Sequence, residues 1–149
     1  DRMRTPLEHS THTLQVQAAC AAVVLDFFHA LDTRRHEAAA ALMAQDGVWL
    51  RQGKRLCGPQ EVMAALNARA PERTTCHVIT NLRLTAWDGA RATVAYFLTA
   101  YESVPHEQGG APRLVAIRDC QDALVETGAG WRLADKRSRR HLPPEPKPE

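Results

Sequence analysis

Three ionisable residues stand where this 149-residue sequence could bring acid–base chemistry together: Asp32, His77 and Asp122. Asp32 closes an apolar segment, where partial burial would raise the pKa of its carboxyl and suit it to a general acid or base. The same side chain could instead act as the N-cap of a following helix, and the two roles are compatible. Asp32 is therefore a candidate catalytic carboxylate.

His77 lies in segment 75–87, whose alternation of apolar and polar residues predicts a strand. In a strand, His77, Ile79 and Asn81 share one face, so His77 would meet Asp32 if that face looks inward, and Asn81 would help to orient the pair. A His–Asp pair can move a proton during dehydration, isomerisation or cyclisation, for which we expect no metal or organic cofactor. A hydrogen-bonded core histidine is the alternative.

Asp122 shares a strand face with Cys120 and Leu124. An acid among apolar neighbours must be paired or functional, because burying an unpaired charge is costly. We expect either a catalytic role for Asp122 or a salt bridge to Arg137 or Arg118.

Aromatic and apolar residues of several segments would line a pocket for a flat or cyclic ligand, although core packing is the alternative for each of them. The expected ligand-contacting residues are Phe28, Trp49, Asn81, Phe97, Tyr101, Cys120 and Arg137, with Tyr96 and Trp131 as further aromatic lining.

The composition is that of one ordinary globular domain, with 44% hydrophobic and 24% charged residues. A net charge of +2 is too small to argue for nucleic acid as a partner. The basic stretch 132–140 is interpreted first as the solvated end of a last strand, an anion or partner patch being the other interpretation. No run of about 18 or more apolar residues is present, so no membrane span is expected.

The cysteines are widely spaced and form no C-x-x-C motif, which favours reduced thiols in a cytoplasmic protein and no metal site. They are Cys20, Cys57, Cys76 and Cys120. We expect a flexible arm at 1–12, a single domain at 13–140 and a disordered proline-rich tail at 141–149.

Helical signals come first along the chain, and strand signals follow. Periodicity predicts a helix at 14–31 that buries Leu14, Ala18, Ala21, Leu25, Phe28 and Leu31. A second helix is expected at 34–44, ended by Asp46-Gly47, then a short hairpin at 48–57 and a third helix at 59–68. Four long strands are expected at 75–87, 91–104, 113–126 and 131–139. This order predicts an α+β fold, in which a curved antiparallel sheet of about six strands wraps three N-terminal helices into a cone around a pocket.

Several segments resemble SnoaL-like proteins of the nuclear transport factor 2-like superfamily, and together they span about residues 14–139. They are residues 28–32, 42–49, 53–58, the His-x-x-x-Asn of 77–81, 119–122 and 130–133. The resemblance implies a cystatin-like fold, a homodimer and a small-molecule pocket, as in polyketide cyclases and scytalone dehydratase.

The resemblance leaves the activity open among three classes. A cofactor-free lyase, isomerase or cyclase would follow scytalone dehydratase, where an acid at the place of Asp32 acts with histidines. That enzyme's second histidine falls at 115–118, where this chain has apolar or basic residues, and its tyrosine before the acid is Leu31 here. A ligand-binding module without catalysis is the second class. A β subunit of an aromatic-ring-hydroxylating dioxygenase, which needs an α subunit as partner, is the third. Ketosteroid isomerase activity is excluded, because its basic carboxylate would fall near Arg51.

Overall fold

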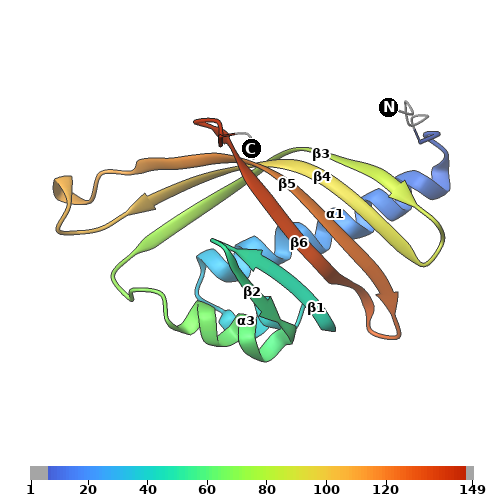
Figure 1. Ribbon diagram of the computed structural model, residues 1–149, viewed down its shortest axis with the longest axis horizontal. Helices are drawn as coiled ribbons and strands as arrows, with labels where there is room; N and C mark the ends of the chain where they lie inside the picture. Colours follow the sequence, from blue (N-terminus) through green and yellow to red (C-terminus); the bar gives the residue numbers. More distant parts are fainter. Residues whose placement is uncertain (1–6, 147–149) are drawn as a thin grey trace.

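The computed structural model describes residues 7–146, in which a curved six-stranded sheet wraps around one long helix (Figure 1). The elements in chain order are α1 (Thr11–Asp32), α2 (His36–Ala40), β1 (Met43–Arg51), β2 (Lys54–Cys57), α3 (Gly58–Asn67), β3 (Thr74–Trp87), β4 (Arg91–Ser103), a 3-10 turn (Gln108–Gly110), β5 (Arg113–Thr127) and β6 (Gly130–Leu142). The strand order is β2-β1-β6-β5-β4-β3. The predicted α+β class with six strands is confirmed. Residues 1–6 of the predicted arm and 147–149 of the predicted tail lie outside the described residues.

Helix α1 crosses the concave side of the sheet and begins at a capping box, in which Ser10 Oγ accepts the Thr13 N–H at 3.1 Å. The predicted buried face is wrong as far as Leu25, because Leu14 and Leu25 are 48% and 50% exposed, and it is right only for Phe28 and Leu31. Apolar residues occupy most of the helix surface, so spacing alone cannot choose the buried side. The buried residues are Val16, Cys20, Val23, Val24, Phe27, Phe28, Ala30 and Leu31.

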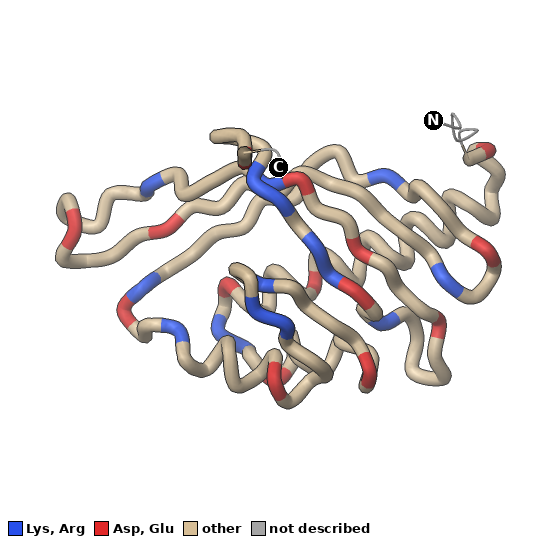
Figure 2. Tube along the Cα trace, in the orientation of Figure 1, with Lys and Arg blue, Asp and Glu red and all other residues tan. Residues whose placement is uncertain are grey.

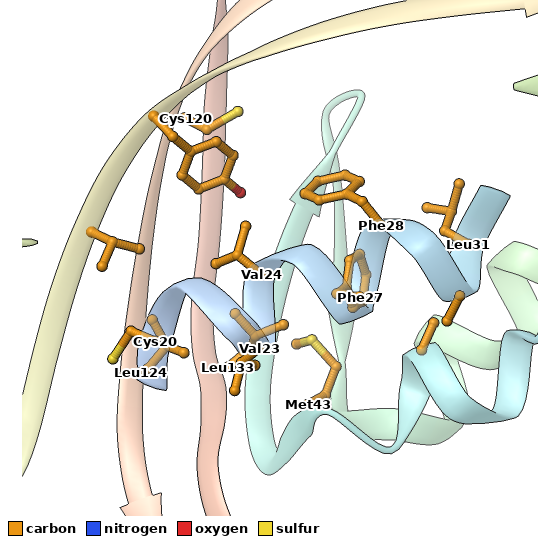
Figure 3. Packing of buried hydrophobic residues seen from close by; sticks show 14 of the residues in the cluster. Cys20, Val23, Val24, Phe27, Phe28, Leu31, Met43, Cys120, Leu124 and Leu133 are labelled. Carbon is orange, nitrogen blue, oxygen red and sulfur yellow. The ribbon is translucent and has the colours of Figure 1, made fainter. Parts of the chain in front are cut away.

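The length and composition of α1 would also suit a membrane span, which the sequence was not expected to contain. In this fold one side of the helix belongs to the core (Figure 3). Val23, Val24 and Phe27 project toward the sheet, where Leu124 and Leu133 meet them from β5 and β6. A helix that packs one side into the core of a domain can have the same length and composition.

Strands β1 and β6 run parallel, which departs from the expected all-antiparallel sheet. Their pairing shifts register beside Gly47, where an added Cβ would collide with the carbonyl oxygen of Leu133. The predicted helix at 34–44 shrinks to α2, and Gly47 lies inside β1 rather than at a helix end. A glycine is needed there because the backbone of β6 approaches so closely.

The β3–β4 hairpin closes at the predicted Asp88-Gly89 turn. Asp88 Oδ1 accepts the N–H groups of Ala90 and Arg91 at 2.9 and 2.8 Å. Gly89 supplies a positive φ of 97°. The turn thus fixes the register in which β3 pairs with β4.

A bulge at Asn81 changes which side chains of β3 face the core. Pairing with β4 shifts register between Thr80 and Arg83, and Asn81 has a φ of 56°. Ile79 packs on the core before the bulge and Leu82 after it, three positions apart. Simple alternation therefore fails beyond Ile79, and Asn81 is exposed.

A second bulge lies in β6. Leu133 and Asp135 pair with consecutive residues of β5, which leaves Ala134 as an extra residue. Leu133 and Lys136 are consequently both buried, although they are three apart. The interpretation of 132–140 as a solvated strand end is thus wrong for Lys136, which is 2% exposed.

The thiols divide into two classes that alkylation can distinguish. Cys57 and Cys76 are exposed, whereas burial raises the pKa of Cys20 to about 11 and of Cys120 to about 12. Because the thiolate is the reactive species, we expect the buried pair to react roughly a hundredfold more slowly at pH 8. Mass spectrometry after timed iodoacetamide treatment measures this. A Cys57→Ser/Cys76→Ser variant should lose the fast phase, and fast labelling of Cys120 would contradict the placement.

Candidate functional site

A cavity of about 180 Å³ lies between the C-terminal part of α1 and the concave face of the sheet. Phe28 and Leu31 of α1 form one wall, and residues of β1 and β3–β6 form the others. This volume lies below the usual range of roughly 300–1,000 Å³ for drug-sized ligands, so the cavity suits a small molecule. The pocket that was expected inside the cone thus lies against the first helix and His77 of β3, although Asn81, expected on the same face as His77, does not line it.

The structure brings Asp32 and His77 together beside this cavity, which His77 lines and Asp32 does not. His77 Nδ1 lies 2.6 Å from Asp32 Oδ1, and the backbone N–H of His77 donates to Asp32 Oδ2 at 2.7 Å. The hydroxyl of Thr75 donates to Asp32 Oδ1 at 2.8 Å. Asp32 is the last residue of α1, and both partners lie at the start of β3. The carboxylate therefore accepts three hydrogen bonds from a single strand.

The electrostatics of Asp32 differ from the sequence-based expectation. Burial alone raises the pKa of its carboxyl. The effect of burial is outweighed by the hydrogen bonds from the ring and backbone of His77, by the positive charge that His77 can carry and by the hydrogen bond from the Thr75 hydroxyl. The pKa of Asp32 therefore lies below its ordinary value. The expected raised pKa is thus wrong, and so is the N-cap role, because α2 begins after Arg35 without a side-chain cap. Asp32 is a fixed carboxylate that orients its neighbour.

His77 presents its second ring nitrogen to the cavity. Donation to a carboxylate places the proton on Nδ1, which leaves Nε2 of the neutral ring with a free lone pair. Nε2 has no hydrogen-bond partner within residues 7–146, and His77 lines the cavity. The Phe28 ring lies 5.3 Å from the imidazole at an interplanar angle of 33° and limits its rotation. The arrangement is that of a general base held by a carboxylate.

Asp122 belongs to a second polar cluster on the same cavity. It is 1% exposed and accepts Lys136 Nζ at 2.7 Å and the Tyr96 hydroxyl at 2.7 Å. The expected salt bridge exists, but its cation is Lys136 rather than Arg137 or Arg118. The bulge at Ala134 explains the difference. The extra residue shifts the pairing of β6 with β5, so that Lys136 rather than Arg137 lies beside Asp122 on the buried face.

Aromatic rings lie around the buried polar groups of this cluster. Lys136 Nζ also lies 4.7 Å from the Phe27 ring centre and 4.8 Å from that of Phe28. Burial and the neighbouring Asp122 raise the pKa of Tyr96 well above its ordinary value, so its hydroxyl stays protonated. The cluster therefore presents an ammonium group and a neutral phenol to the cavity.

The structure places only some of the expected ligand-contacting residues on the cavity. Phe28, Trp49, Cys120 and Arg137 line it. Three others do not, contrary to expectation, and they are Asn81, Phe97 and Tyr101. Asn81 sits in the bulge of β3, whereas Phe97 and Tyr101 belong to the face of β4 opposite to that of Tyr96 and Leu98.

Besides Arg118, which was expected only as a partner of Asp122, four charged residues of the cavity were not predicted from the sequence: Lys136 and the three arginines Arg51, Arg69 and Arg73. The three arginines come from the end of β1 and from the connection between α3 and β3. No spacing along the chain signals that they converge. Within residues 7–146, no three His, Cys, Asp or Glu side chains are grouped closely enough to hold a metal ion.

Comparison with known proteins identifies a protein family that matches this sequence and several solved structures with a similar fold. A family model described as a SnoaL-like domain matches residues 12–137. A nuclear transport factor 2-like protein with a cystatin-like fold from Novosphingobium aromaticivorans has a TM-score of 0.74 at 17% identity, over 87% of this chain and 84% of that one. A protein of Catenulispora acidiphila in complex with S-DNPA also has a TM-score of 0.74, at 18% identity, over 87% and 96% of the two chains.

A hexachlorocyclohexane dehydrochlorinase, LinA type 2, has a TM-score of 0.74 at 18% identity, over 86% of each chain. A search of curated proteins gave no match. At these identities the solved structures establish that the fold is shared.

Replacing Asp32 by Asn tests the lowered pKa. A group whose pKa is lower in the folded protein contributes stability above its unfolded pKa, about 3.9, and loses it as pH falls through the folded value. We expect Asp32→Asn to lower the free energy of unfolding by about 2 kcal/mol at pH 6. Urea unfolding between pH 6 and pH 3 should show this difference shrinking below about pH 4. A difference that does not depend on pH would contradict the assignment.

The buried pair of Asp122 and Lys136 makes a second prediction. Lys136→Met leaves the Asp122 carboxylate without its cation, and we expect a loss of about 3–5 kcal/mol in urea unfolding. Lys136→Met combined with Asp122→Asn should recover most of this loss, because no unpaired charge remains. Additive losses in the double variant would show that the two side chains are not coupled.

Proposed function

This chain belongs to the SnoaL-like domain family, and we propose that it is a lyase or isomerase in which His77, oriented by Asp32, removes a proton from a small molecule. The observation that carries the proposal is the 2.6 Å contact between His77 Nδ1 and Asp32 Oδ1, with the other ring nitrogen free at the cavity. Such a pair can run proton-transfer chemistry with no bound cofactor.

In the proposed reaction His77 acts as the base, and the substrate then either loses a group or is isomerised. Nε2 of His77 takes a proton from a carbon of the substrate, and the electron pair of the broken C–H bond forms a new double bond. In a lyase reaction a leaving group then departs with its bonding electrons. In an isomerisation the imidazolium returns the proton to a different atom. Either course balances protons and electrons within the substrate and His77.

Lys136 is placed to stabilise the negative charge that develops in such a step, because its ammonium group donates to Asp122 and Tyr96 and keeps a third N–H, whereas Tyr96 gives its only proton to Asp122. The ammonium group is held by Asp122 and by the faces of two phenyl rings, so it cannot reorient freely. Preorganised charge in a partly dry cavity stabilises a transition state more than mobile solvent does. Asp32 meanwhile stabilises the imidazolium that forms on His77.

The structural relatives support a reaction of this class. One of them is a dehydrochlorinase, whose name denotes an elimination, and another was solved with a small molecule bound. The fold therefore accommodates both elimination and small-molecule binding, and the activity must be argued from the site of this chain. A ligand-binding module without catalysis is the alternative that the experiment must separate.

His77→Gln is the decisive variant. We expect wild-type protein to eliminate or isomerise some members of a panel of β-hydroxy, β-halo and β,γ-unsaturated carbonyl compounds, followed by ultraviolet absorbance. Loss of the general base should reduce turnover by about 10²–10⁴-fold while the melting temperature stays within a few degrees.

His106→Gln is the matched control, because His106 is exposed and lies outside the cavity. Its turnover should equal that of the wild type. Equal turnover by His77→Gln and wild type would exclude His77 as the base. Binding of panel compounds without turnover would favour the binding module.

A further inference from the structure

One end of the cavity carries an unusual concentration of positive charge. Figure 2 shows Lys and Arg positions on the β1–β2 hairpin and in the connection between α3 and β3. Arg51, Arg69 and Arg73 all line the cavity. Three guanidinium groups therefore border a space of about 180 Å³, whose other walls combine apolar side chains with the Asp122–Lys136 cluster.

Only one of these three arginines is neutralised. Arg73 Nε lies 2.6 Å from Glu102 Oε2. Arg51 and Arg69 form no salt bridge with any carboxylate of residues 7–146. Two positive charges at the cavity are thus left without an ion-pair partner in the described part of the chain.

Arg69 is nevertheless held in place. Its Nη2 donates to Thr75 Oγ1 at 2.8 Å, and its Nη1 donates to the Leu31 carbonyl oxygen at 3.4 Å. A guanidinium has five N–H donors, so three remain for another group. Arg51 is positioned differently, with its guanidinium carbon 5.3 Å from the centre of the Trp49 ring. Both cations are ordered by the fold rather than by an anion.

The cluster is electrostatically unfavourable as it stands. Burial, followed by the charges of Arg73, Arg34 and Arg51, lowers the pKa of Arg69 to about 10, and nearby Asp32 offsets only part of this. Burial and the charge of Arg73 also lower the pKa of Arg51. Like charges gathered around a partly dry cavity repel one another, and an anion placed between them would relieve that repulsion.

We propose that the cavity binds a small organic acid, with its carboxylate between Arg51 and Arg69 and its apolar body along Phe28 and Trp49. The planar fork of a guanidinium matches a carboxylate in a way that an ammonium group cannot. The remaining cations of the wall already have carboxylate partners. Arg137 pairs with Asp135 at 2.7 Å, Lys136 with Asp122 at 2.7 Å and Arg118 with Glu145 at 3.8 Å.

This inference rests on the proposed function in one respect, because it names the substrate class of the same cavity. Arg69 donates to Thr75, and both Thr75 and His77 donate to Asp32. The carboxylate would accordingly bind at the same end of the cavity as His77. The proton that His77 removes would come from a carbon close to the acid group.

Matched acids and amides test the proposal without requiring turnover. Acetate, benzoate, phenylacetate and cinnamate are each compared with the neutral amide by calorimetry at low ionic strength. We expect at least one aromatic acid to bind about tenfold more tightly than its amide, as charge-assisted hydrogen bonds would provide. The preference should weaken as salt is added. Phenyl phosphate and benzenesulfonate are measured beside them, and tighter binding of either would overturn the assignment to a carboxylate.

Arg51→Gln is the key variant, because the Arg51 side chain donates no hydrogen bond within residues 7–146 and its loss should not disturb the fold. We expect the acid–amide preference to fall below about twofold, which is the loss of one charge-assisted contact. The melting temperature of the unliganded variant should rise, because repulsion within the cluster decreases. Arg69→Lys should keep part of the preference, since it retains the charge and loses the fork.

Arg83→Gln controls for net charge, because Arg83 is exposed on β3 and lies outside the cavity. It should bind like the wild type. If no acid of the panel binds better than its amide, or if Arg51→Gln leaves the preference unchanged, the proposal is wrong. His77→Gln should still bind the acid, because His77 does not contact the proposed carboxylate site. If the wild-type protein binds the acid but turns over no compound of the panel, the catalytic proposal is wrong and the binding proposal stands.

Discussion

The carboxylate of Asp32 joins the end of α1 to the start of β3, and the geometry of the cavity depends on that junction. A half-buried carboxylate is tolerated only where hydrogen bonds replace its lost hydration. Here they come from Thr75 and from the ring and backbone of His77, all on one strand. Because the backbone N–H of β3 is one of the donors, the helix end is tied to the sheet itself rather than to a movable side chain. The junction that closes the cone therefore also sets the direction of the imidazole.

Burial around this junction sorts the ionisable groups into fixed states. Hydrogen bonds lower the pKa of Asp32, and burial raises the pKa of Cys120 and Tyr96, so none of the three changes its charge near neutral pH. Lys136 is bound to Asp122. Nε2 of His77 is left as the basic atom that faces a ligand. Because Asp32, Cys120 and Tyr96 keep their charge states near neutral pH, we assign the role of base to His77 rather than to Asp32.

The sequence revealed the elements and the contact of Asp32 with His77, because helix ends, turn residues and strand alternation are local signals. It failed where a strand bulges. Alternation placed Asn81 beside His77 and paired Asp122 with Arg137, yet an extra residue in β3 and another in β6 reverse those faces. The sequence also failed for α1, whose apolar residues fit more than one buried side. The position of a bulge and the buried side of a helix depend on contacts with neighbouring strands. Periodicity along a single segment carries no information about those contacts.

The arginines at the cavity show a different limit, because their significance arises only from convergence. Each is unremarkable in its own segment, at the end of β1 or after α3, and ordinary solvated arginines occur in such places. Folding brings Arg51 and Arg69 to the same cavity without a carboxylate to pair them in residues 7–146. A fold that needed only stability would gain by replacing one of them with a neutral residue, since their mutual repulsion opposes folding. Positive charge kept at such a position is explained when the missing partner is a ligand, and the nearby base then has an anchored molecule on which to act.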